Sequence, residues 1–153
     1  MNAASAWLGL LLGASLGPGL TACAVAETPA SSAEQNYMLR CQGCHGAEGR
    51  GVAHKVPSLR DSVGKLVLTD DGRDFLMRVP GAANSSLSDA QLADVLNWLV
   101  LRFGGAALPK PAPGFTAADV TAARRLPLVG VHRARLEIAA RLTAAGLTPP
   151  QDY

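Results

Sequence analysis

The chain has few aromatic residues and little net charge for its length. Its 153 residues include only 5% Phe, Trp and Tyr, and the formal net charge is +2. Nucleic-acid binding requires a concentrated basic face, so this charge argues against a nucleic-acid partner. A small domain with few large apolar side chains buries little surface, and such domains usually need a disulfide, a metal or another covalent staple.

Charge is missing altogether from the N-terminal segment, because no side chain between Met1 and Ala22 is ionisable. The apolar run from Trp7 to Leu20 is interrupted by Gly17-Pro18-Gly19, so it is too short and too broken to span a membrane. It is typical of the apolar region of a secretory signal peptide. We therefore expect residues 1–22 to be removed on export.

Two processing sites compete at the end of this segment. Leu20-Thr21-Ala22-Cys23 resembles a bacterial lipobox, in which Cys23 becomes the lipidated first residue and anchors the protein to the membrane. Ala24-Val25-Ala26 matches an ordinary signal-peptidase site and would give a start near Glu27. We favour the lipobox, because it explains the thiol at Cys23. Residues 23–32 would then form a tether, and the protein would be periplasmic and lipid-anchored.

Cysteine is scarce, and the two remaining cysteines fall in one motif. Cys41-Gln42-Gly43-Cys44-His45 is a C-x-x-C-H sequence, the attachment signal for c-type haem. Two thiols on one helical turn reach the two vinyl groups of a haem, and His45 then binds the iron as the proximal ligand. A zinc site would lack its fourth ligand, and a thioredoxin-like pair needs a βαβ context. We therefore predict one covalently bound haem c at Cys41, Cys44 and His45.

Helix signals lie on both sides of this motif. Ser31 or Ser32 caps a helix that runs to about Arg40, and Ser88 opens a longer helix that ends at Gly104. The apolar residues of the longer helix recur at three- and four-residue spacing: Leu92, Val95, Leu96, Leu99, Val100 and Phe103. Between these helices, Asp70-Asp71-Gly72 indicates a turn.

The next stretch, residues 74–78, predicts a short helix that Pro80 stops. The segment from Ala33 to Gly104 then resembles a class I cytochrome c domain. It has a helix running into C-x-x-C-H, a glycine-rich loop, a Pro-x-Leu segment and a final amphipathic helix opened by Leu87-Ser88-Asp89. The resemblance implies an all-α fold, in which the first and last helices cross with Tyr37 and four aliphatic residues between them. These four are Leu92, Val95, Leu96 and Leu99.

The same resemblance implies two further roles near the haem. The carbonyl of Pro57 would accept a hydrogen bond from Nδ1 of His45, which fixes the ring and tunes the iron. Leu59 would line the haem pocket. One or two cations of the haem-bearing segment are expected to pair with the haem propionates. The candidates are Arg50, Lys55, Arg60, Lys65, Arg73 and Arg78.

The distal ligand is the point where the sequence departs from this family. Class I cytochromes place a methionine, often followed by proline, before the last helix, and that register here holds Val79-Pro80. Met77 is the predicted distal ligand, because it is the only methionine on this stretch and a thioether is a soft iron ligand. His54, His132 and an open sixth site are the alternatives.

Residues 105–153 lie outside the resemblance and are predicted to form a helical extension. Thr116 caps one helix, Pro127 breaks it, and residues 129–145 form another. With six Lys or Arg against three Asp or Glu, the extension is basic. It either packs on the core or offers a docking surface to an acidic partner. Its expected apolar stripe consists of Ala134, Leu136, Ile138, Ala139 and Leu142.

Together these features predict an electron-transfer protein rather than an enzyme. Its partners would be redox proteins, and its mechanism would need no catalytic side chain. A haem subunit of a periplasmic amine or alcohol dehydrogenase is one alternative, because a free shuttle does not need the extension. A haem enzyme or sensor with an open sixth site is the other.

Overall fold

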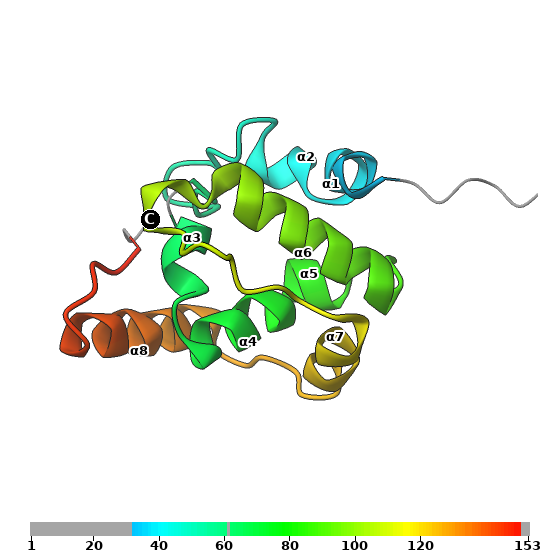
Figure 1. The fold of residues 1–153 in the computed structure, drawn as a ribbon. Helices are drawn as coiled ribbons and strands as arrows, with labels where there is room; N and C mark the ends of the chain where they lie inside the picture. The colour runs from blue at the N-terminus through cyan, green and yellow to red at the C-terminus, as the bar shows by residue number, and fades with distance from the viewer. Residues whose placement is uncertain (1–31, 61, 151–153) are drawn as a thin grey trace, which may run out of the picture.

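The computed structural model describes residues 32–60 and 62–150. The signal peptide, its two candidate cleavage sites, Cys23 and the tether up to residue 31 lie outside the described residues. The fold is all-α, as predicted, and the described residues contain no β-strand beyond an isolated bridge between Val52 and Val56. The helices are α1 (Ala33–Arg40), α2 (Gln42–His45), α3 (Ser62–Leu66), α4 (Asp70–Arg78), α5 (Pro80–Ala83), α6 (Asp89–Phe103), η1 (Gly105–Ala107), α7 (Ala117–Arg124) and α8 (Val131–Ala144) (Figure 1).

Local capping signals set the starts of three helices where the sequence placed them. Ser32, Ser88 and Thr116 each accept a hydrogen bond from the backbone N–H three residues on. In each case the side chain at that third position returns a bond to the cap backbone, which completes a capping box. These bonds depend only on neighbouring residues, so they can be predicted without knowledge of the tertiary fold.

The predicted turn at Asp70-Asp71-Gly72 is wrong, because these residues form the first turn of α4. Thr69 caps the helix by accepting a bond from the Gly72 backbone, and the two aspartates lie where the helix dipole favours negative charge. Gly72 also allows a close approach to α3, since an added Cβ would lie 2.0 Å from the carbonyl oxygen of Leu66. Pro80 ends α4 as expected but also begins α5 as its first residue.

Helices α1 and α6 pack against each other through aromatic side chains. The ring of Tyr37 lies 5.1 Å from that of Trp98 and 5.6 Å from that of Phe103, and Tyr37 is almost completely buried. The four aliphatic residues of α6 that the sequence placed at this crossing line a cavity instead. Helix α6 therefore uses one side for α1 and another for the cavity.

The C-terminal extension shares the hydrophobic core of the preceding segment. Its buried core residues are Phe115, Val120, Ala123, Ile138 and Leu142. Asn97 of α6 donates to the carbonyl of Phe115 over 2.9 Å and accepts from its N–H over 2.7 Å. Arg73 and Arg78 of α4 donate to the carbonyls of Gly114 and Leu126. The extension therefore packs on the core, one of the two arrangements expected from the sequence.

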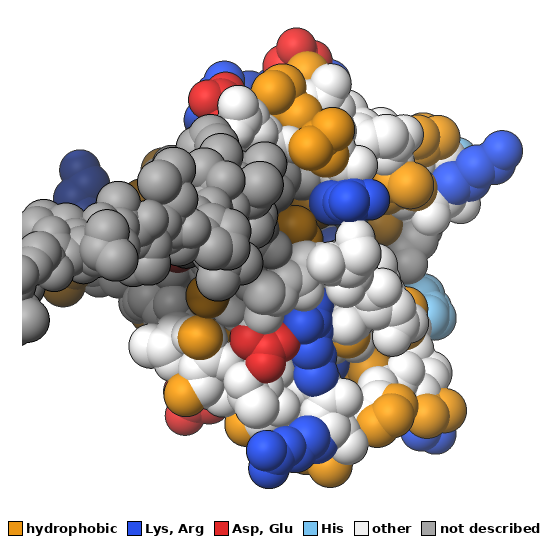
Figure 2. Space-filling model, turned by 90° about the vertical axis from the view of Figure 1, so that its right-hand side faces the viewer, with side chains coloured by type: hydrophobic (Ala, Val, Ile, Leu, Met, Phe, Trp, Pro, Cys, Tyr) orange, Lys and Arg blue, Asp and Glu red, His pale blue; other side chains and the backbone are white. Residues whose placement is uncertain are grey.

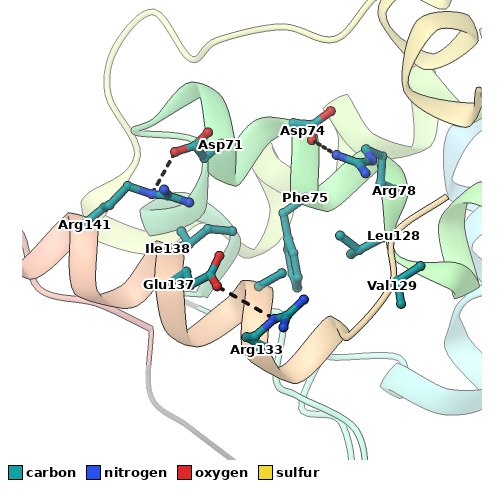
Figure 3. A pocket seen from close by; sticks show the side chains of 11 residues that line it. Asp71, Asp74, Phe75, Arg78, Leu128, Val129, Arg133, Glu137, Ile138 and Arg141 are labelled. Carbon is teal, nitrogen blue, oxygen red and sulfur yellow. Dashed lines mark hydrogen bonds and ion pairs between the residues drawn. The ribbon is translucent and has the colours of Figure 1, made fainter. Parts of the chain in front are cut away.

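Helix α8 lies against α4 with an apolar centre and a charged rim (Figure 3). The hollow between the two helices is lined by Phe75 and Ile138, among others. Arg141 pairs with Asp71 across it over 2.9 Å. Such exposed ion pairs contribute about 0–1 kcal/mol, so apolar contacts carry most of the packing energy.

Basic side chains do not gather into a single patch on the described part of the face in Figure 2, where they are dispersed among apolar ones. Within residues 32–60 and 62–150, no helix has the length and the continuous apolar character needed to cross a bilayer.

Replacing Asn97 with alanine is expected to loosen the extension. The change removes both hydrogen bonds to Phe115 and leaves that backbone unpaired, so the free energy of unfolding should fall by about 1–3 kcal/mol. Urea unfolding measures the change. Asp94→Ala, at an exposed position of the same helix, should shift it by less than about 0.5 kcal/mol. Equal losses in the two variants would contradict this account of the docking.

Candidate functional site

An apolar cavity lies between α2, the loop that follows it, and helices α3 to α6 and α8. The cavity and its open mouth contain about 1220 Å³ of empty space. Its wall is largely aliphatic: Val56, Leu59, Val63, Leu66, Leu76, Val79, Leu87, Leu92, Val95, Leu96, Leu99 and Val131. A wall of this kind suits a large, flat and mostly apolar group.

Cys41, Cys44 and His45 all line this cavity. The N–H groups of Cys44 and His45 bond to the carbonyl of Cys41, so the three residues share one turn. Both cysteines are free thiols, Cys41 half-buried and Cys44 exposed. Burial, reinforced by the neighbouring Cys44, raises the pKa of the Cys41 thiol. The structure thus places both thiols beside the imidazole at the cavity wall.

The His45 ring is held by the backbone of the following loop. Its Nδ1 lies 3.2 Å from the carbonyl oxygen of Pro57, the contact expected from the sequence. A donor at Nδ1 leaves the lone pair of Nε2 available, which is the arrangement found in metal-bound histidines. Burial lowers the pKa of His45, and the bond to Pro57 opposes that shift only in part. The neutral form that can bind a metal is therefore favoured.

Glycine and tyrosine residues shape the loop that presents Pro57. Gly51 has a φ of +68°, and an added Cβ would lie 2.2 Å from the carbonyl oxygen of Val56. The buried hydroxyl of Tyr37 donates to the carbonyl of Gly46 over 2.6 Å, directly after His45. Burial raises the pKa of Tyr37, so it remains a hydrogen-bond donor at neutral pH. Leu59 lines the cavity, as expected.

The structure does not bring the predicted distal ligand together with His45. Met77 is buried in α4, with 8% of its surface exposed, but it is not among the cavity-lining residues. Its helix neighbour Leu76 and the following Val79 line the cavity. His54 and His132 are both exposed and do not line it either.

The cations expected near the propionates are used in different ways. Lys55 lines the cavity. Arg73 and Arg78 bond to the extension, as described above, and the ammonium group of Lys65 donates to the carbonyl of Pro149. Two arginines that were not proposed from the sequence, Arg40 and Arg135, line the cavity.

Arg135 is the residue that sequence reasoning missed most clearly, because it was treated as part of an exposed basic helix. It is 6% exposed, whereas Leu136, which was placed on the apolar stripe, is 47% exposed. The buried side of α8 consists of Arg135, Ile138 and Leu142. These positions follow the three- and four-residue spacing of a core-facing stripe, and that spacing was the available signal.

The chain is similar to cytochromes c. It is 28% identical over 99 residues to cytochrome c-552 of Thermus thermophilus, a match that covers 53% of this chain and 76% of that protein. A second cytochrome c-552, from a named strain of the same species, is 28% identical over 99 residues and is covered to 67%. No protein-family model matches the chain. These similarities agree with the resemblance found around the C-x-x-C-H motif.

Gly51→Ala is expected to disturb the loop that presents Pro57. A left-handed conformation costs an alanine about 1–2 kcal/mol, and the clash with Val56 adds to it, so the free energy of unfolding should fall by about 2 kcal/mol or more. Gly43→Ala is the control, because Gly43 is helical and has open space around it. That change should be neutral or slightly stabilising. Similar chemical-denaturation midpoints for the two variants would count against this role of Gly51.

Proposed function

We propose that the chain is a c-type cytochrome, with one haem c attached to Cys41 and Cys44, that transfers single electrons between redox partner proteins. The observation that carries the proposal is the shared turn of Cys41, Cys44 and His45 at the wall of an apolar cavity, with the ring of His45 held by Pro57. The similarity to cytochrome c-552 supports it.

Attachment requires only chemistry that the two thiols can perform. Each S–H adds across one vinyl C=C of the porphyrin, so a thioether forms and no group leaves. Cys44 is exposed and Cys41 is half-buried, which places the attachment side of the haem close to the molecular surface. An edge near the surface is where an electron can pass to a partner.

The remaining residues hold and insulate the haem. When bound, its iron supplies the Fe(II)/Fe(III) couple. His45 would bind the iron through Nε2, and Pro57 would keep the ring in position. The aliphatic wall excludes water, which limits the reorganisation of solvent when the charge changes. No side chain of the chain needs to act as an acid, a base or a nucleophile during electron transfer.

Export and anchoring form a second part of the proposal. The apolar segment before Cys23 supports export to the periplasm, and the lipobox-like sequence supports a lipid anchor on Cys23. The alternative role as a dehydrogenase subunit relied on the extension, but its apolar residues are buried in this chain's own core. That observation removes the main reason to assign the extension to a partner subunit.

Replacing Cys41 and Cys44 together with alanine should abolish covalent haem, because no thioether can form. Haem staining of a denaturing gel measures this, and Cys23→Ser serves as the control that keeps the full signal. The proposal fails if the double variant still stains as strongly as the unchanged protein.

Cys23→Ser is also expected to move the protein from the membrane fraction to the soluble periplasmic fraction, because no lipid can be attached at position 23. Cell fractionation and immunoblotting measure the change. An unchanged membrane fraction would show that Cys23 is not the anchor, and it would leave the haem proposal intact.

A further inference from the structure

The wall of the cavity opposite α2 is built from two parts of the chain. In Figure 1, α2 lies at the top of the molecule, while α4 and α8 lie together at the bottom. All three contribute to the same cavity, α2 through His45, α4 through Leu76, and α8 through Val131 and Arg135. A haem bound to His45 would therefore present its other face towards the side of α4 and α8.

This far side contains no good iron ligand among the described residues that line the cavity. Leu76, Val79 and Val131 are aliphatic, and no methionine or second histidine lines the cavity. Lys55 lines it too, but Lys55 is two residues before Pro57, on the loop that holds His45. Val79 also occupies the register in which a methionine is expected.

We propose that the sixth coordination position of the iron is open to a small exogenous ligand, and that Arg135 binds this ligand by hydrogen bonding. The inference rests on the proposed haem attachment and goes beyond electron transfer. The ligand class is a small anion with hydrogen-bond acceptor atoms, for which cyanide is the probe.

The chemistry of Arg135 supports this role. It is the charged side chain of the far wall, and only 6% of its surface is exposed. A guanidinium has five N–H donors in a fixed fork, so it keeps donors for a ligand in addition to any contact within the protein. Hydrogen bonds to a charged group contribute about 1.5–3 kcal/mol, more than neutral ones. An anion beside Arg135 would therefore be held more strongly than a neutral ligand.

The extension provides the rigidity that such a site needs. Helix α8 is fixed by Ile138 and Leu142 in the core and by the ion pair between Arg141 and Asp71. Arg135 lies on the same side of α8 as the two core residues. Residues outside the cytochrome-like segment thus complete one wall of the cavity, which gives the extension a function within its own chain.

Optical spectra and ligand titration of the purified haem-loaded protein test the proposal. The ferric protein should show a high-spin spectrum that Met77→Leu does not change, and the ferrous protein should bind carbon monoxide readily. Arg135→Gln should weaken ferric cyanide binding at least about tenfold. It should change carbon monoxide affinity by less than about threefold, because carbon monoxide is neutral and a weak acceptor. Arg133→Gln, exposed on the same helix, is the control and should leave both affinities unchanged.

Three results would overturn the proposal. A low-spin ferric spectrum with a weak far-red band that Met77→Leu abolishes would assign the sixth position to Met77. A ferrous protein that does not bind carbon monoxide would show a closed site. Equal cyanide affinities of Arg135→Gln and Arg133→Gln would remove Arg135 from it. All three leave covalent haem intact, whereas failure of the proposed function would appear as an absence of covalent haem.

Discussion

The bond between Nδ1 of His45 and the carbonyl of Pro57 is the contact on which the site depends. It joins the C-x-x-C-H turn to the loop that returns over the cavity, so one interaction orients the imidazole and closes one wall. Two other features hold this contact in place. The Tyr37 hydroxyl fixes the backbone immediately after His45, and Gly51 permits the tight path that leads to Pro57. Because the imidazole loses solvent there, its neutral form is favoured.

The opposite wall depends on the C-terminal extension. Helix α7 packs on α6 and α4, and α8 packs on α4, so residues after Gly104 complete the core begun by the preceding segment. Arg135 and Val131 then reach the cavity that His45 borders. The two sides differ in chemistry, since the first has a sulfur and imidazole attachment site and the second has aliphatic side chains and one buried guanidinium. This asymmetry is what makes binding of an outside ligand compatible with a cytochrome-like fold.

The features that were predictable from the sequence are local. The capping boxes at Ser32, Ser88 and Thr116 involve residues three apart, and the C-x-x-C-H motif specifies its own turn. The start of α4 was missed, because an Asp-Asp-Gly sequence favours a turn unless a cap such as Thr69 precedes it.

The far wall of the cavity was not predictable in the same way. Arg135 enters the cavity through packing between α8 and α4, which are distant in the sequence. A charged residue on an otherwise basic helix is usually exposed, so only the spacing of its apolar neighbours pointed to burial. Likewise, Met77 and Val79 are two residues apart, and whether each lines the cavity depends on the end of α4 at Arg78.

Mass spectrometry of tryptic peptides tests the central claim most directly. Cleavage after Arg40 and Arg50 releases residues 41–50, which contain both cysteines of the motif and His45. Our account predicts that this peptide carries the added mass of one haem and that no other peptide does. Recovery of the peptide with two free thiols, or with a disulfide between Cys41 and Cys44, would contradict it.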